Sequence, residues 1–222
     1  MNRRAFLQSV AGTAFAAVLP CRSESAPANP ATTIDECSTD GRVCRAGISL
    51  STALMAYASQ QMSVWCWAAS IEMIFRAHGY YVPQQEIVQA VYGRVVNLPA
   101  FSGYTISTQL NRSWTDTRGR NFTVRIDGLY DHDAHIFGLS NSAVVNALQA
   151  GNPLIYGNVS HAMMLGIVDY YPVSPEPQFR AAGFADPWPG IGLRGLSDPL
   201  EIVAMDVGGK LRYLAVPIVT PN

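Results

Sequence analysis

The chain has few charged residues, few cysteines and no long apolar run. Only 14% of its residues are charged, whereas about a quarter is usual in soluble domains. Its formal net charge is −1, and Lys210 is the single lysine among 15 basic residues. No basic block is therefore present to bind nucleic acid. No apolar run approaches the roughly 20 residues that a membrane-spanning helix needs. These shortages argue against a disordered chain, a nucleic-acid-binding protein and a transmembrane protein.

The length and the apolar content together limit the size of the fold. Apolar residues make up 49% of the 222 residues. This is enough for one domain with a sizeable core, or for two small lobes that share an interface. The chain is too short for several independent domains.

The first 28 residues predict a bacterial export signal. Arg3-Arg4 precede Ala5-Phe6-Leu7, and a short apolar stretch runs from Val10 to Leu19. Ala26-Pro27-Ala28 then has the small-x-small pattern of a cleavage site. The paired arginines resemble the twin-arginine signal of bacteria, which exports folded proteins. The mature protein is therefore expected to be periplasmic or secreted.

Two of the four cysteines are expected to form a disulfide. Cys37 and Cys44 stand seven residues apart around an Asp40-Gly41 turn, in a chain predicted to reach an oxidising compartment. The alternative is a pair of metal ligands, but no histidine lies near them and Cys-x6-Cys is not a usual zinc spacing. Residues 29–50 are therefore expected to form an N-terminal arm that this disulfide pins.

The other two cysteines have separate interpretations. Cys21 follows Val18-Leu19-Pro20, which faintly resembles a lipoprotein signal. Proline is a poor match at that position, so cleavage after Ala28 is preferred to lipid anchoring at Cys21. Cys66 has no partner, and an unpaired thiol in an exported protein has to be buried or used.

Apolar periodicity predicts helices in the first half of the chain and strands in the second. The pattern changes from Ser63, and the expected helices run from Cys66 to about Ala77, from Pro83 to Gly93, around residues 107–111, and from Ser140 or Asn141 to Gly151. The expected strands are the runs 122–126, 154–159, 161–171, 179–185, 200–206 and 211–219, with a loop over 128–139. This order predicts an α+β fold in which a helical half leads into an antiparallel sheet.

Cys66 stands between Trp65 and Trp67, where a predicted loop enters the first helix. Unpaired amides and the positive end of the helix dipole favour a thiolate there, which is the nucleophilic form of cysteine. The two tryptophans would wall such a site and limit the access of water. The alternative is that Cys66 is a buried and inert core residue, which is common.

His161 and Asp186 could supply the other groups that a cysteine nucleophile needs. His161 begins an otherwise apolar strand, which would present it at the edge of a cleft as a general base. Asp186 precedes Pro187 and could accept a hydrogen bond from the imidazole. The alternatives are a histidine satisfied at a strand end and a common Asp-Pro turn. Asp169 is a rival partner for His161, but it stands about 26 Å away along the same extended strand.

Together these residues resemble the papain-like cysteine proteases over residues 60–75 and 147–190. Gln60 precedes Cys66 by six positions, as the oxyanion-hole glutamine precedes the nucleophile in that family. Cys66-Trp67-Ala68 matches the nucleophile and the two residues after it. The run 148–168 is similar to the segment that leads into the catalytic histidine, and Asp186-Pro187-Trp188 stands where the family has Asn-Ser-Trp. The Trp-Cys-Trp-Ala-Ala form looks closest to the bacterial branch that includes secreted effector proteases.

The resemblance implies a papain-like catalytic domain over residues 51–222, with two lobes, a cleft between them and no cofactor. A helical lobe would supply Cys66, and a lobe of antiparallel strands would supply His161 and Asp186. Cys66 would attack a carbonyl carbon. His161 would take the thiol proton and pass a proton to the leaving amine, while Asp186 would orient the imidazole ring.

The resemblance also implies an oxyanion hole, although the sequence departs from the family nearby. The side chain of Gln60 and the backbone amide of Cys66 would hold the oxyanion, with Gln61 as the donor if the register differs by one. Ser63 stands where animal and plant members have a disulfide cysteine, and an aspartate replaces the usual asparagine. The catalytic histidine would follow Cys66 by 95 residues, which is a shorter spacing than in papain.

The sequence therefore predicts an exported cysteine peptidase that acts on proteins or peptides. One alternative is a papain-like deamidase or acyltransferase, and another is a non-catalytic binding domain in which Cys66 is buried. Asp131-His132-Asp133-Ala134-His135 is a further cluster of residue types that bind metals. Gly128 and Gly138 flank it, so a solvated loop is preferred there to a zinc or nickel site.

Overall fold

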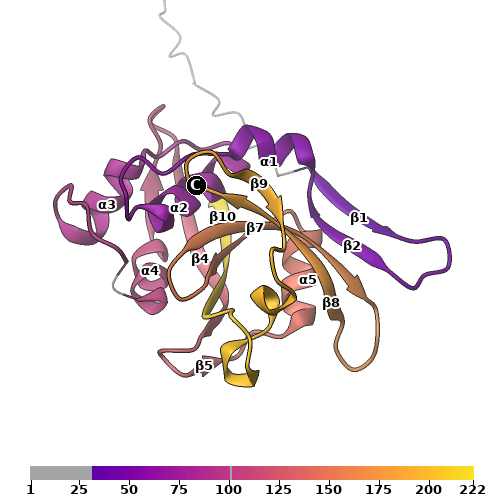
Figure 1. Cartoon of the computed structure of the whole chain (residues 1–222). Coiled ribbons are helices and arrows are strands. Elements are labelled where there is room, and N and C mark those ends of the chain that lie inside the picture. Colours follow the sequence, from indigo (N-terminus) through magenta and orange to yellow (C-terminus); the bar gives the residue numbers. More distant parts are fainter. Residues whose placement is uncertain (1–31, 101) are drawn as a thin grey trace, which may run out of the picture.

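The computed structural model describes residues 32–100 and 102–222, which form an α+β fold around one ten-stranded sheet (Figure 1). The predicted export signal over residues 1–28, with Cys21, lies outside the described residues. The helices are α1 (Leu50–Ala56), α2 (Cys66–Ala77), α3 (Gln84–Tyr92), α4 (Gly103–Leu110) and α5 (Asn141–Gln149). None of the helices in the described ranges is long and apolar enough to cross a membrane.

The strands pair side by side in the order β1-β2-β7-β6-β10-β4-β3, while β8 pairs with β7 and β9, and β5 pairs with β4. Every pair of these strands is antiparallel. Their bounds are β1 (Thr33–Cys37), β2 (Cys44–Ile48), β3 (Ser113–Thr115), β4 (Asn121–Asp131), β5 (Ile136–Phe137), β6 (Leu154–Gly157), β7 (Ala162–Tyr171), β8 (Gln178–Asp186), β9 (Gly192–Gly195) and β10 (Tyr213–Pro221).

The α+β class agrees with the prediction, but the order of the elements is more mixed. β1 and β2 precede the first helix, and β3 to β5 lie between α4 and α5. β2 also pairs with β7, so the predicted N-terminal arm is joined to the main sheet. Figure 1 shows the β1–β2 hairpin extending beyond the rest of the sheet.

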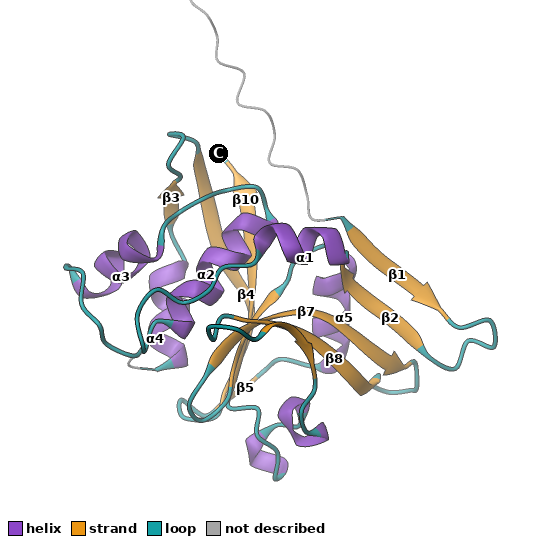
Figure 2. Ribbon diagram, turned by 45° about the horizontal axis from the view of Figure 1, so that its top comes forward, coloured by secondary structure: helices purple, strands orange, loops and turns teal. Residues whose placement is uncertain are grey.

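Both faces of the sheet are buried, because side chains alternate between two apolar clusters. Leu154 and Tyr156 of β6 pack into one cluster with Val144 and Leu148 of α5. Ile155, between them, packs into the other cluster with α2. Helix α2 therefore lies against one face of the sheet and α5 against the opposite one (Figure 2).

Local signals set the helix ends that the sequence predicted best. Pro83 precedes α3, and Gly93 ends it in the left-handed conformation at φ 72°. The Ser140 hydroxyl accepts from the backbone N–H of Ala143 and caps α5. Helix α2 begins at Cys66 and ends at Ala77, as the sequence predicted.

The strand predicted over residues 200–206 is wrong. The chain there forms two short 3-10 helices, η1 (Pro199–Ile202) and η2 (Met205–Val207). Asp198 caps the first by accepting from Leu200 N, and Pro199 occupies its first turn. This capping outweighs the apolar run that suggested a strand.

The loop predicted over residues 128–139 is also partly wrong. β4 continues through Gly128 to Asp131, and β5 pairs with it. Gly128 does not break the strand, because it packs under a neighbour: a Cβ there would lie 2.7 Å from Leu139 Cδ1.

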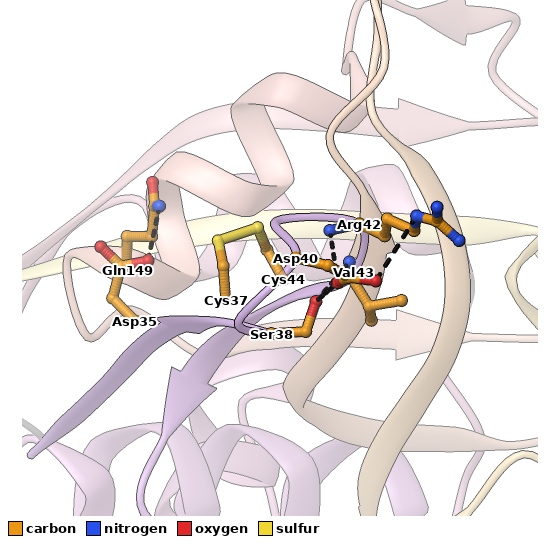
Figure 3. Close-up of a disulfide and its surroundings, with 8 residues drawn as sticks. All are labelled: Asp35, Cys37, Ser38, Asp40, Arg42, Val43, Cys44 and Gln149. Atoms are coloured by element: carbon orange, nitrogen blue, oxygen red, sulfur yellow. Dashed lines mark hydrogen bonds and ion pairs between the residues drawn. A yellow bond between two sulfur atoms is a disulfide. The ribbon is translucent and has the colours of Figure 1, made fainter.

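The predicted disulfide between Cys37 and Cys44 is present at the end of the β1–β2 hairpin (Figure 3). Its turn is held by Asp40, whose Oδ1 accepts from the Ser38 hydroxyl at 2.6 Å and from Arg42 N at 3.1 Å. Gln149 at the end of α5 donates to Asp35 of β1 at 2.9 Å. The hairpin is thus held to the body of the protein by α5 at the middle of β1 and by the pairing of β2 with β7.

We expect Gly47→Ala in β2 to destabilise the protein by about 1–3 kcal/mol, as overpacking of a core does. A Cβ on Gly47 would lie 2.5 Å from the backbone oxygen of Gly166 on β7, so the two strands would have to separate. Gly195→Ala is the control, because the nearest atom to its Cβ is 3.9 Å away. It should change the free energy of unfolding by less than about 0.5 kcal/mol. Urea unfolding measures both, and equal stabilities would contradict the close packing of β2 on β7.

Candidate active site

Cys66 is the first residue of helix α2 and is half-buried, with a free thiol. Trp65, the residue before it, makes no side-chain capping hydrogen bond. Its side chain therefore does not occupy the N–H groups of the first helical turn. Ser70 donates to the Cys66 carbonyl at 2.8 Å. The thiol therefore lies at the electropositive end of a buried helix, as the sequence predicted.

His161 lies in the turn between β6 and β7, one residue before β7 begins. The Asn158 side chain accepts from the backbone N–H groups of Ser160 at 3.0 Å and His161 at 2.8 Å. The Asn158 backbone N–H donates to the His161 carbonyl at 2.9 Å. The turn thus fixes the backbone of His161 on both sides.

Asp186 is the last residue of β8, whose antiparallel pairing with β7 brings it beside His161. Nε2 of His161 lies 2.6 Å from Asp186 Oδ1. The same oxygen accepts from the backbone N–H of Trp188 at 2.9 Å. The Trp188 ring meets the imidazole edge to face, with 6.1 Å between the ring centroids. Because Nε2 faces the carboxylate, Nδ1 is the nitrogen left to interact with Cys66.

A cavity of about 310 Å³ lies beside this group of residues, between α2, α4 and the sheet. Cys66 and His161 both line it, together with Trp67 and Trp188. Trp65 was predicted to wall the site, but it is not among the lining residues.

Residues 94–100, before α4, are held against the helix by the two indoles. Trp65 donates to the Val96 carbonyl at 2.8 Å, and Trp67 donates to the Leu98 carbonyl at 3.3 Å. Asn97 donates to the Ser63 hydroxyl at 3.0 Å. Pro99 and Ala100, which follow, line the cavity. The tryptophans therefore position one wall of the cavity as well as forming part of it.

The imidazole of His161 favours its charged form. Burial opposes the charge, but the hydrogen bonds to Asp186 and to Cys66 outweigh it, and together they raise the pKa of His161 to about 9. Burial would likewise raise the pKa of Asp186, but the contacts with His161, Trp188 N and Arg194 hold it below the ordinary value. A charged imidazole between a thiol and a carboxylate suits a thiolate–imidazolium pair.

Arg194 and Glu201 extend this chain of charges, and the sequence did not reveal either of them. Arg194 on β9 donates through Nε to Asp186 Oδ2 at 3.0 Å. Its other nitrogens donate to Glu201 at 3.1 and 3.2 Å. Only the pairing of β9 with β8 places Arg194 beside Asp186, and β9 is too short to show alternation. The one hint in the sequence was Asp186 at the end of a predicted strand, because a carboxylate that is buried there needs a cationic partner.

Gln60 lies beside the cavity but does not line it. Its side-chain nitrogen donates to the carbonyls of Met62 at 3.1 Å and Ser63 at 3.0 Å. Its backbone N–H donates to the Pro187 carbonyl at 2.8 Å, which also accepts from the Ser59 hydroxyl at 3.2 Å. Both amide hydrogens of the side chain are thus used within the loop before α2, and neither faces the cavity.

The structure does not place Gln61 as an oxyanion donor, and it does not form a metal site from the 131–135 cluster. Gln61 is exposed, contacts Gln85 through its side chain and does not line the cavity. Within residues 32–100 and 102–222, no group of three or more histidine, cysteine or acidic side chains is placed to hold a metal ion. Asp131 is not solvated as a loop residue would be, since only 1% of it is exposed.

No family model matches this chain, and no curated protein matches it. Among solved structures, the crystal structure of UfSP from C. elegans is similar, with a TM-score of 0.44 and 17% sequence identity. The match covers 75% of this chain and 32% of that one, so this chain spans about a third of the length of that protein. A likeness this distant carries no argument about function, and the site has to be interpreted from its own geometry.

We expect Asp186→Asn to lower the pKa of His161 from about 9 toward the ordinary value of 6.5. The amide would keep a hydrogen-bonding group beside the ring but would remove the negative charge. Titration of labelled histidine by NMR measures the shift. Asp169→Asn is the control, because Asp169 lies near the other end of β7 and pairs with Arg45 of β2. An unchanged His161 pKa in Asp186→Asn would contradict the assigned contact.

The same shift predicts how stability depends on pH. A folded-state pKa of His161 above 6.5 stabilises the fold fully below pH 6.5, and this contribution is lost as the pH rises to about 9. Urea unfolding of the wild type and of His161→Gln at pH 6 and pH 9.5 should show a difference that shrinks at the higher pH.

We expect Arg194→Met to destabilise the fold by about 3 kcal/mol, the lower end of the range for a broken buried ion pair. It leaves Glu201, whose side chain is 10% exposed, without the cation that pairs with it, and it leaves Asp186, which is 7% exposed, with only the charge of His161. Arg45→Met is the matched control, because Arg45 is 47% exposed in its pair with Asp169. It should cost less than about 1 kcal/mol. Equal losses in thermal or urea unfolding would contradict this difference in burial.

Proposed function

We propose that this protein is an exported cysteine peptidase with a papain-like, two-lobed catalytic domain. It hydrolyses peptide bonds through Cys66, His161 and Asp186. The observation that carries this proposal is that a thiol and an imidazole from distant segments line one cavity, with a carboxylate hydrogen-bonded to the far side of the imidazole. Each group comes from the end of a helix or strand, and rigid elements of this kind hold reacting groups well.

The thiol starts the reaction. Its proton passes to Nδ1 of His161, and the sulfur of Cys66 attacks the carbonyl carbon of the substrate. The carbonyl π electrons move to oxygen and form a tetrahedral intermediate. When this intermediate collapses, the C–N bond breaks and the leaving amine takes the proton from His161. Water, deprotonated by the same nitrogen, then attacks the thioester, releases the acid and returns the thiol.

Asp186 keeps the imidazole in the orientation and tautomer that this sequence needs. With Nε2 hydrogen-bonded to the carboxylate, the ring presents Nδ1 to the sulfur at each step. The Trp188 ring lies edge to face with the imidazole and so supports its orientation.

The oxyanion would be held by the backbone N–H of Cys66 at the start of α2. Gln60, the second donor that the resemblance suggests, would have to turn its side-chain nitrogen away from the Met62 and Ser63 carbonyls. Substrate binding would therefore include a rearrangement of this loop before Gln60 contributes.

Two further observations bear on the alternatives. Cys66 is half-buried and lines the cavity, which weighs against an inert core thiol. The Cys37–Cys44 disulfide supports an oxidising compartment, and so a periplasmic or secreted protein. Deamidation or acyl transfer would use the same thioester and differ only in the amide attacked and in the acceptor.

We expect Cys66→Ala to reduce peptide cleavage by at least about 10³-fold, since the covalent step cannot occur without the sulfur. Mass spectrometry of a peptide library incubated with the wild type and with this variant gives the cleaved bonds. Equal cleavage by both would refute the proposal. Conversion of glutamine to glutamate without chain cleavage, or transfer to an added amine, would assign the deamidase or acyltransferase chemistry instead.

His161→Ala should slow alkylation of Cys66 by iodoacetamide at neutral pH by at least about 10²-fold. The variant retains the thiol but removes the group that accepts its proton. Gln61→Ala, outside the cavity, is the control and should alkylate at the wild-type rate.

A further inference from the structure

The cavity beside Cys66 contains a buried carboxylate that the proposed reaction does not use. Asp131, at the end of β4, lines the same cavity as Cys66 and His161 and is 1% exposed. Its Oδ1 accepts from the backbone N–H groups of Asp133 at 3.0 Å and Ala134 at 3.1 Å. Its Oδ2 is buried and has no hydrogen-bond partner in the described part of the chain.

The other charged groups among the described residues that line the cavity are already paired. Arg212 also lines the cavity, but its Nε donates to Asp133 at 2.7 Å and its Nη1 to the Val159 carbonyl at 3.3 Å. His161 interacts with Asp186 and with Cys66. Two acids and one arginine on this side of the cavity therefore leave one negative charge, that of Asp131, without a counter-charge.

The charge of Asp131 also affects the pKa of a neighbouring tyrosine, Tyr213. Tyr213 lies opposite Asp131 in the pairing of β10 with β4, and it also lines the cavity. Burial raises the pKa of Tyr213, a hydrogen bond with Ser107 opposes this, and the charge of Asp131 raises it further. The charge of Asp131 therefore affects a second residue that lines the cavity.

A buried and uncompensated carboxylate is costly, because desolvation is not offset by a partner. The cost is recovered when a cation enters and pairs with it. The rest of the wall is suited to the apolar stem of such a side chain, since Ile106, Ile155 and Ala162 also line the cavity. A cavity of about 310 Å³ is at the lower end of the range for ligand sites.

We propose that Asp131 recognises a positively charged side chain, arginine or lysine, of the substrate polypeptide. This inference rests on the proposed peptidase function and names the class of substrate it acts on. When the side chain enters, the wall around the buried Oδ2 of Asp131 has to open, and this oxygen then accepts a hydrogen bond from the guanidinium or ammonium group, while Oδ1 stays on the turn that holds it in place. Asp133 and Arg212 neutralise each other, so Arg212 does not offset the charge of Asp131.

The test uses pairs of substrates that differ in charge and little in shape. A positional peptide library first locates the position at which a basic residue is preferred. Peptides with arginine or citrulline, and with lysine or norleucine, are then compared at that position by kcat/KM. A hydrogen bond to a charged group predicts a preference of at least about tenfold for the charged member of each pair.

Asp131→Asn is the decisive variant, because it keeps Oδ1 as an acceptor for the turn and replaces Oδ2 and its negative charge with an uncharged amide nitrogen. It should reduce each preference to less than about threefold, mainly by lowering kcat/KM for the charged peptide. The citrulline and norleucine peptides should be cleaved at nearly the wild-type rate. Asp169→Asn, an identical change outside the cavity, should retain the wild-type preference, and circular dichroism confirms that both variants are folded.

The outcomes separate this inference from the function on which it rests. Cleavage that depends on Cys66 but shows no preference for the charged peptides overturns the role of Asp131 and leaves the peptidase intact. A preference that persists in Asp131→Asn also overturns it. A preference that disappears when the peptide amino termini are acetylated shows that a terminal ammonium is recognised instead of a side chain. If no peptide is cleaved in a Cys66-dependent way, the proposed function and this inference both fail.

Discussion

The contact between His161 and Asp186 is the interaction on which the rest of the site depends. It spans 2.6 Å and joins the start of β7 to the end of β8, so the antiparallel pairing of those strands sets it. The contact determines which ring nitrogen is free, and therefore where a proton can be taken and returned. It also keeps positive charge on the ring against the effect of burial. Without it, the thiol would face a neutral imidazole of undefined orientation.

The charges behind this contact alternate in sign, from His161 through Asp186 and Arg194 to Glu201. Arg194 alone would weaken the electrostatic attraction between Asp186 and the charged imidazole. Glu201 offsets this by sharing the guanidinium, and the Phe184 ring lies 5.2 Å from its central carbon. The network thus holds the carboxylate rigidly while leaving it negative enough to stabilise a charged ring. The alternation explains how several ionised groups share a partly buried region at little net electrostatic cost.

The sequence was most informative where one residue determines a local conformation. Pro83 and Gly93 marked the ends of α3, and the close spacing of Cys37 and Cys44 indicated their pairing. It also singled out Cys66, His161 and Asp186, which the structure brings together, although their catalytic roles remain predictions. In each case a residue of unusual chemistry stood at a recognisable boundary between elements.

Features that depend on long-range packing could not be predicted in this way. Gly128 looked like a break, but its missing side chain makes room for Leu139 within a continuous strand. The sequence predicted a solvated loop at Asp131, whereas in the structure this residue ends β4 and is buried. The direction of the Gln60 side chain depends on two carbonyls of its own loop, and the position of Arg194 depends on the neighbour of β9. None of these follows from periodicity, because each is decided by what lies across the fold.

Two hydrogen bonds, from the Ser59 hydroxyl and the Gln60 backbone N–H, reach the Pro187 carbonyl. They join the segment before the nucleophile to the segment after the acid. Cys66 follows Gln60 by six residues, and Asp186 directly precedes Pro187. The same two bonds therefore help to fix the spacing between the start of α2 and the end of β8, on which the alignment of the sulfur with the imidazole depends.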